Sequence, residues 1–189
     1  MGQCHLMPGS QVQYLSSKLS AYDKIGILCQ ILMDKADMDQ MLEWYVNQKC
    51  SPPSPHFIKQ SILERHGISN STWVETGTFK GNTTAFLANR FKHVHSIEPQ
   101  YNLYQQARKN LSYIPNITLH LGTSEDTFET VLGLIRSDVC FWLDGHYSSG
   151  DTFRGHNATP IKHELRVIAK HLAKFSGVVV LIDDIRMSS

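Results

Sequence analysis

Short apolar runs alternate with longer, helix-like segments over the last two thirds of the chain. In the longer segments, apolar residues recur every three or four positions, as Tyr104, Ala107 and Leu111 do, and this spacing is typical of an amphipathic helix. The apolar runs predict five strands, at 72–76, 93–98, 117–121, 138–143 and 177–183. Apolar strands that alternate with helices indicate a parallel sheet covered on both faces. We therefore expect an α/β fold of the doubly wound, Rossmann-like kind.

The first seventy residues do not show this alternation. Residues 12–49 are expected to be helical, and four apolar side chains share one helix face there: Met38, Met41, Leu42 and Tyr45. A proline-rich break follows, and then a short helix through Leu63 that closes at Gly67. We expect an N-terminal helical extension at 1–70 that caps a ligand-binding domain at 71–189. A dimer surface or a substrate lid is the alternative use of the apolar stripe.

A glycine turn follows the first predicted strand. Glu75, Gly77 and Gly81 have the spacing E-x-G-x-x-x-G, and helix-capping residues come next at 82–84. Glycine lacks a Cβ, so the backbone of such a turn can approach a ligand closely, and the free N–H groups of the following helix point at the same place. The second predicted strand ends in Glu98, and a carboxylate there is the usual partner of a ribose diol. The sequence therefore predicts a site for a nucleoside-containing cofactor.

Polar residues follow all five predicted strands. In a parallel sheet the carboxyl ends of the strands lie at one edge, and ligands bind there. The polar residues and glycines expected at this edge are Glu75, Gly77, Glu98, Gly122, Ser124, Glu125, Asp144, His146, Asp183 and Asp184. The opposite ends of the strands carry far fewer polar groups, so this edge is the predicted site of the chemistry.

The composition narrows the range of partners. The 189 residues carry a formal net charge of +1, which provides no broad basic surface for nucleic acid or for a membrane surface. No apolar run approaches the roughly 20 residues that span a bilayer, and the first residues do not have the pattern of a signal peptide. The four cysteines are scattered without a C-x-x-C pair, as is typical of reduced thiols. We expect a cytoplasmic protein that acts on a small molecule.

From Trp73 to Arg186 the chain resembles the class I S-adenosylmethionine-dependent methyltransferases. More narrowly, it resembles the metal-dependent O-methyltransferases of the catechol, caffeoyl-CoA and macrocin (antibiotic-sugar) type. The motifs occur in the family's order: the E-x-G-x-x-x-G turn, Ile97-Glu98-Pro99, the strand and turn at 117–126, Leu143-Asp144 and Asp183-Asp184. The resemblance implies the strand order 3-2-1-4-5 and S-adenosylmethionine as the cofactor.

The resemblance also implies a role for each of these motifs. Residues of the glycine turn would line the methionine part of the cofactor, Glu98 would hold the ribose hydroxyls, and the turn after the third strand would lie near the adenine. The residues implied to bind the cofactor are Glu75, Gly77, Thr78, Gly81, Glu98, Gly122, Ser124, Glu125 and Asp144.

A divalent cation is implied as well, held by Asp144, Asp183 and Asp184. Carboxylates at two neighbouring strand ends, with open coordination positions, suit Mg²⁺. Such an ion would lower the pKa of an acceptor hydroxyl, whose oxygen then attacks the sulfonium methyl group. Two other interpretations stay open. Asp183 and Asp184 could cap a following helix, or Asp144 could serve the cofactor or the acceptor without a metal.

The sequence departs from the family pattern at two points. Catechol-type enzymes carry a lysine as base shortly after the strand-four aspartate, and this chain has none there. His146 is expected to act as the base beside Asp144, with Tyr147 as the second choice. The family continues after strand five with a helix and an antiparallel strand pair, whereas this sequence ends at Ser189. We expect a partner subunit or the N-terminal helices to cover the apolar edge at 178–182.

The leading functional hypothesis is the methylation of a hydroxyl on a small acceptor, with S-adenosylmethionine as donor and Mg²⁺ as helper. A nicotinamide or nucleotide-sugar enzyme is disfavoured by the glycine spacing and by the lack of a Tyr-x-x-x-Lys relay. A third hypothesis is a non-catalytic or metal-independent Rossmann-like protein that binds a nucleotide cofactor. No motif identifies the acceptor.

Overall fold

A computed structural model describes residues 35–51, 53–144 and 160–183. The chain divides into two compact units, Met1–Phe57 and Ile58–Ser189. In the first unit, the structure describes the helix α3 (Lys35–Val46), and none of its residues is buried. Whether the apolar stripe of α3 caps the second unit stays a prediction.

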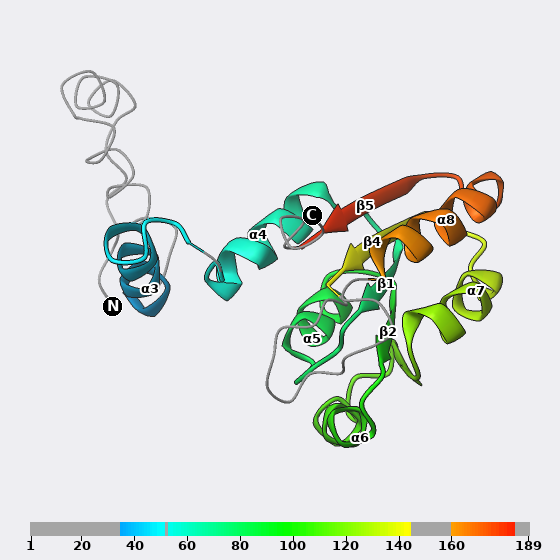
Figure 1. Ribbon diagram of the computed structural model, residues 1–189, viewed down its shortest axis with the longest axis horizontal. Coiled ribbons are helices and arrows are strands. Elements are labelled where there is room, and N and C mark those ends of the chain that lie inside the picture. Colours follow the sequence, from blue (N-terminus) through cyan, green and yellow to red (C-terminus); the bar gives the residue numbers. More distant parts are fainter. Residues whose placement is uncertain (1–34, 52, 145–159, 184–189) are drawn as a thin grey trace, which may run out of the picture. The chain divides into compact units, whose positions relative to one another are not determined.

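The second unit is built on a parallel sheet of five strands (Figure 1). The strands are β1 (Thr72–Thr76), β2 (His93–Glu98), β3 (Ile117–Leu121), β4 (Val139–Leu143) and β5 (Val178–Ile182). Their order is β3-β2-β1-β4-β5, and every neighbouring pair runs parallel. The prediction of a Rossmann-like α/β fold with strand order 3-2-1-4-5 is therefore confirmed.

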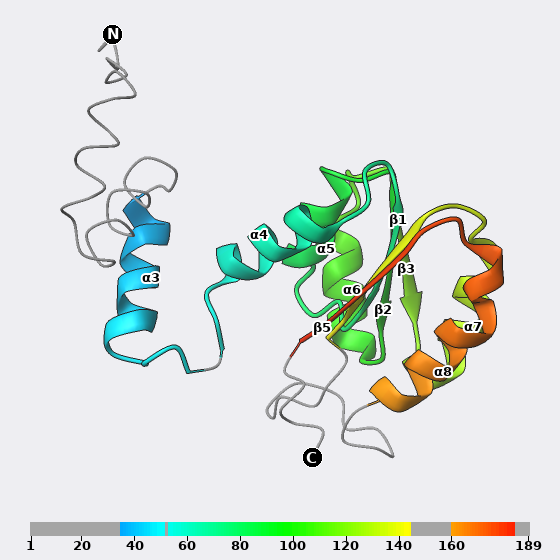
Figure 2. The ribbon, with the colours of Figure 1, turned by 90° about the horizontal axis from the view of Figure 1, so that it is seen from above.

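Helices cover both faces of this sheet, as Figure 2 shows. On one side lie α4 (His56–His66), α5 (Asn82–Ala88) and α6 (Tyr101–Asn110), and on the other lie α7 (Ser124–Leu134) and α8 (Ile161–His171). A short 3₁₀ turn, Leu172–Lys174, follows α8. None of the described helices is long and apolar enough to cross a membrane.

The two faces of the sheet carry two separate apolar clusters. Successive side chains of a strand point to opposite faces, so Trp73 packs with Leu63 of α4 and Leu87 of α5, whereas Val74 packs with the α7 side. All five residues of β1 are buried, as are all five of β4. This double coverage explains why β4 (Val139–Leu143) is a continuous apolar run instead of an alternating one.

β5 is the edge strand of the described sheet and pairs with β4. Its five residues are half-buried. Val178, Val180 and Ile182 pack against the α7–α8 cluster, while Val179 and Leu181 pack on the opposite face. Both faces of β5 are thus used for packing, and cover of its outer edge by a partner or by the N-terminal helices stays a prediction.

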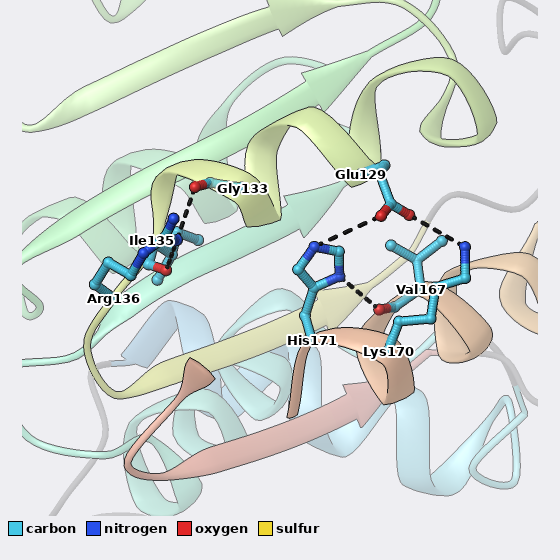
Figure 3. A network of polar contacts seen from close by, with 7 residues as sticks. All are labelled: Glu129, Gly133, Ile135, Arg136, Val167, Lys170 and His171. Carbon is cyan, nitrogen blue, oxygen red and sulfur yellow. Dashed lines mark hydrogen bonds and ion pairs between the residues drawn. The ribbon is translucent and has the colours of Figure 1, made fainter. Parts of the chain in front are cut away.

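The contact between α7 and α8 ends in a polar cluster on the surface (Figure 3). The carboxylate of Glu129 on α7 lies 3.6 Å from Lys170 Nζ and 3.6 Å from His171 Nε2, both on α8. His171 Nδ1 lies 3.0 Å from the Val167 carbonyl and donates to it within α8. Because Glu129 and Lys170 are mostly exposed, we expect this pair to add less than about 1 kcal/mol to stability.

We expect replacement of Phe141 by alanine to cost about 3–5 kcal/mol of unfolding free energy, because it leaves a cavity in the core. Phe141 is fully buried on β4, with the rings of Phe128 and Phe175 at centroid distances of 6.0 and 6.3 Å. The Glu129→Ala variant, at the exposed α7–α8 cluster, should lose less than about 1 kcal/mol. Urea denaturation of both variants measures the difference. A Phe141→Ala cost as small as that of Glu129→Ala would contradict this account of the core.

Candidate functional site

The sheet brings the predicted site residues together at its carboxyl edge. Backbone hydrogen bonds continue just past the strand ends: Asp144 N–H donates to the Thr76 carbonyl at 3.2 Å, and Asp183 N–H donates to the Leu143 carbonyl at 3.1 Å. Gly122 N–H likewise donates to the Glu98 carbonyl at 3.0 Å. The residues that follow the five strands therefore leave the sheet side by side. His146 and Asp184 lie outside the described residues.

The turn after β1 has the backbone shape expected of a ligand-binding loop. Gly77 and Gly81 have φ values of 89° and 83°, in the region that favours glycine. A Cβ on Gly81 would also come within 2.8 Å of Leu111 Cδ1, the end of a side chain, so the positive φ is the main reason for glycine there. Phe79 also has a positive φ, 50°, which is uncommon for a bulky residue. The positive φ and the half-exposed ring make Phe79 a further candidate at this turn, one that the sequence did not reveal.

Glu98 holds this turn against the end of β2. Its Oε2 accepts a hydrogen bond from Phe79 N–H at 2.8 Å, and its Oε1 accepts one from Gln100 N–H at 3.0 Å. Burial raises the pKa of the Glu98 carboxyl, and the two backbone hydrogen bonds oppose the rise. Each carboxylate oxygen can accept a further hydrogen bond, so Glu98 can still receive the hydroxyl groups of a ribose.

Glu75 is fully buried beneath the same turn. Its Oε2 accepts hydrogen bonds from Thr84 Oγ1 at 2.5 Å and from Ser96 Oγ at 2.6 Å, which ties β1 to α5 and to β2. Burial raises the pKa of Glu75 to about 7; the two hydroxyl groups lower it, and the charges of Asp144 and Glu98 raise it further. Asp144 and Glu98 are thus close enough to Glu75 to raise its pKa, and this gathering of carboxyl groups favours a ligand that brings positive charge.

The turn after β3 is fixed by the start of α7. Gly122 has a φ of 146°, and a Cβ there would lie 2.6 Å from Thr127 Cγ2. Thr123 caps α7, because its Oγ1 accepts a hydrogen bond from Asp126 N–H at 3.2 Å. Ser124 is buried directly after this cap, and Glu125 beside it is partly exposed. Of the three residues expected near the adenine, Gly122 thus lies just before the cap of α7, and Ser124 and Glu125 are the first residues of that helix.

The structure adds Glu164, a buried acid that the sequence analysis did not single out. Glu164 lies in the first turn of α8 with no exposed surface, and neither of its carboxyl oxygens accepts a hydrogen bond of normal geometry among the described residues. Burial raises its pKa to about 7, and the nearby hydroxyls of Ser124 and Thr76 lower it only in part. Among the described residues, the buried Thr76 Oγ1 likewise has no hydrogen-bond partner of normal geometry. The one sequence signal was the place of Glu164 on the apolar helix face between Ile161 and Ile168.

The aspartates at the ends of β4 and β5 are the described part of the predicted metal site. Asp144 and Asp183 are both partly exposed, and their oxygens are of the kind that Mg²⁺ prefers. Asp183 Oδ2 forms an ion pair with the ammonium group of Lys59 from α4. No group of three or more metal-binding side chains occurs in the described part of the chain. The carboxylate oxygens of Asp144 and Asp183 fit a divalent cation, and Asp183 already has the Lys59 ammonium beside it.

The buried Glu164 carboxyl predicts a pH-dependent effect of Glu164→Gln. The folded protein keeps a proton up to about pH 7 that the unfolded protein releases near pH 4.5. The stability linked to this proton is complete below pH 4.5 and is lost as the pH rises to about 7. Glutamine does not titrate, so the stability of Glu164→Gln relative to the wild type should rise by up to about 3 kcal/mol over this range. Urea denaturation at pH 4.5, 6 and 7.5 checks this, and a difference that does not change with pH would show that Glu164 is not a buried acid.

Several solved structures are similar to this chain. A rRNA methylase from Streptococcus thermophilus is 24% identical with a TM-score of 0.46, and the match covers 73% of this chain and 76% of that one. A putative methyltransferase from Streptococcus mutans in complex with SAH is 21% identical with a TM-score of 0.46, over 69% and 73% of the two chains. A putative caffeoyl-CoA O-methyltransferase from Staphylococcus aureus is 14% identical with a TM-score of 0.48, over 85% and 71%.

No curated protein matches the sequence. The family profile described as a methyltransferase domain does match, over residues 74–185. This match covers more than half of the 189 residues and begins in β1 and ends just after β5. It thus contains the glycine turn, Glu98, Asp144 and Asp183, which are the residues that the fold gathers at one edge of the sheet. The chain belongs to the family of methyltransferase domains.

Proposed function

We propose that the protein transfers a methyl group from S-adenosylmethionine to a hydroxyl oxygen of a small acceptor, assisted by a divalent cation. The observation that carries the proposal is the pairing of Glu98 with the glycine turn. Glu98 accepts the N–H of Phe79, inside the turn, so the carboxylate and the turn form one preorganised surface. This arrangement suits a ligand that has a ribose diol next to a group that needs close backbone approach.

In this proposal the cofactor lies across the ends of β1, β2 and β4. Glu98 accepts hydrogen bonds from the ribose hydroxyls, and the backbone of Gly77, Thr78 and Gly81 receives the methionine part. The turn formed by Gly122, Ser124 and Glu125 lies next to the adenine. Glu75 acts from beneath the turn, through Thr84 and Ser96, by tying β1 to α5 and to β2.

The charge of the edge favours this cofactor over a dinucleotide. Asp144 and Glu98 both raise the pKa of Glu75, so each added negative charge near them is unfavourable. The pyrophosphate of a nicotinamide dinucleotide carries two negative charges and would meet these carboxyl groups at the glycine turn. S-adenosylmethionine instead brings a positive sulfonium and an ammonium group, which such carboxyl groups attract. The same argument disfavours a nucleotide sugar.

The acceptor is proposed to bind beside the ends of β4 and β5. Asp144 and Asp183, with Asp184, would hold Mg²⁺, and the ion would supply charge that favours ionisation of an acceptor hydroxyl. Asp144 lies between the cofactor turn and Asp183, so it can orient the acceptor oxygen toward the sulfonium methyl. His146 is proposed as the base that accepts the hydroxyl proton. A small hydroxylated molecule is the proposed acceptor.

The cofactor proposal is tested by titration calorimetry with S-adenosylhomocysteine. We expect micromolar binding by the wild type and binding about tenfold or more weaker for Glu98→Ala, because this variant loses hydrogen bonds between a carboxylate and the ribose. Glu129→Ala, on the outer side of α7, serves as the control and should bind as the wild type does. If NAD⁺ binds and S-adenosylhomocysteine does not, the cofactor assignment is wrong.

The metal proposal is tested by chelation. We expect excess EDTA to lower methyl transfer at least tenfold, since the acceptor oxygen loses its stabilising charge. Binding of S-adenosylhomocysteine should change by less than about threefold, because the proposed ribose and methionine contacts do not involve the ion. Added Mg²⁺ should restore transfer. Undiminished transfer in EDTA would leave a methyltransferase that works without a metal.

A further inference from the structure

The pair formed by Lys59 and Asp183 joins α4 to the proposed acceptor side of the sheet. The side chains are 20% and 15% exposed, so both groups are largely withdrawn from water. An ion pair in such a place interacts more strongly than one on the open surface, because water screens it less. The sequence separates the two residues by 124 positions, and only the fold brings them together.

The position of Lys59 on α4 makes this contact specific. Lys59 precedes Leu63 by four residues, so the two side chains share one helix face, and Leu63 is fully buried in the core. Arg65 lies on the same helix and is exposed. The face of α4 that packs on the sheet through Leu63 therefore also places the Lys59 ammonium group at the end of β5.

We infer that the Lys59 ammonium occupies the cation position beside Asp183 and competes with the divalent metal ion for that carboxylate. The inference rests on the metal site of the proposed function. Asp183 carries one negative charge. A divalent ion that binds Asp183 must either displace the Lys59 ammonium or lie close to it, where the two positive charges repel each other. Metal affinity is thereby lowered, and occupation of the site by metal is coupled to the contact between α4 and β5.

Binding of Mn²⁺ to the protein without cofactor or acceptor, measured by calorimetry, tests this competition. Lys59→Met removes the charge and keeps a long side chain, and it should bind Mn²⁺ at least tenfold more tightly than the wild type. Lys59→Arg keeps the charge and should stay within about threefold of the wild type. Arg65→Met, the matched loss of an exposed charge on α4, should also stay within threefold. Circular dichroism of each variant confirms that it is folded.

A second comparison isolates Asp183. In the Asp183→Asn background, the change from Lys59 to Met should no longer tighten Mn²⁺ binding, since the contested carboxylate is gone. Equal Mn²⁺ affinity of the wild type and Lys59→Met overturns the inference and leaves the metal site of the proposed function in place. Absence of Mn²⁺ binding in both, with S-adenosylhomocysteine still bound, overturns the metal site and the inference together. Tighter binding in Lys59→Met and Arg65→Met alike would reveal a general charge effect and would also overturn the inference.

Discussion

The matched register of the parallel sheet is the constraint on which the site depends. Thr76 pairs with Ile97 on one side and with Leu143 on the other, and Leu143 pairs with Ile182. Because the last residues of neighbouring strands are paired, the strands end side by side. The residue that follows each strand therefore leaves the sheet at the same edge. A shift by one residue would turn the side chains to the opposite faces and bury different groups. Convergence of the polar residues is therefore a consequence of apolar strand pairing, and the core on both faces holds that pairing in place.

Much of this arrangement could be predicted from the sequence, because it follows from local pattern. The apolar runs located all five strands to within a residue at each end, and the spacing of Gly77 and Gly81 predicted a turn that the positive φ values confirm. These features depend on periodicity and on the conformational freedom of glycine, which are properties of short segments. The family match covers residues 74–185, the stretch in which these motifs lie.

The contacts between distant segments could not be predicted in this way. Nothing in the sequence indicates that Glu164 is buried with no hydrogen-bond partner of normal geometry in the described part of the chain, or that Lys59 reaches Asp183. The contact of His95 Nδ1 with His120 Nε2 at 3.1 Å is another such case, since it arises from the pairing of β2 with β3. Whether a polar side chain meets a partner depends on how helices and strands pack, and composition and spacing do not encode this.

The same carboxyl groups that shape the edge also influence how it distinguishes donor from product. Burial raises the pKa of Glu75 to about 7, and the charges of Asp144 and Glu98 raise it further. Under the proposed function, methyl transfer converts a sulfonium into a neutral thioether, so the ligand loses one positive charge. The attraction between ligand and carboxyl groups then falls, and the preference for the charged donor over its product follows from the electrostatics of the edge. Lys59 adds a positive charge at the far end of the same edge, where it offsets the charge of Asp183.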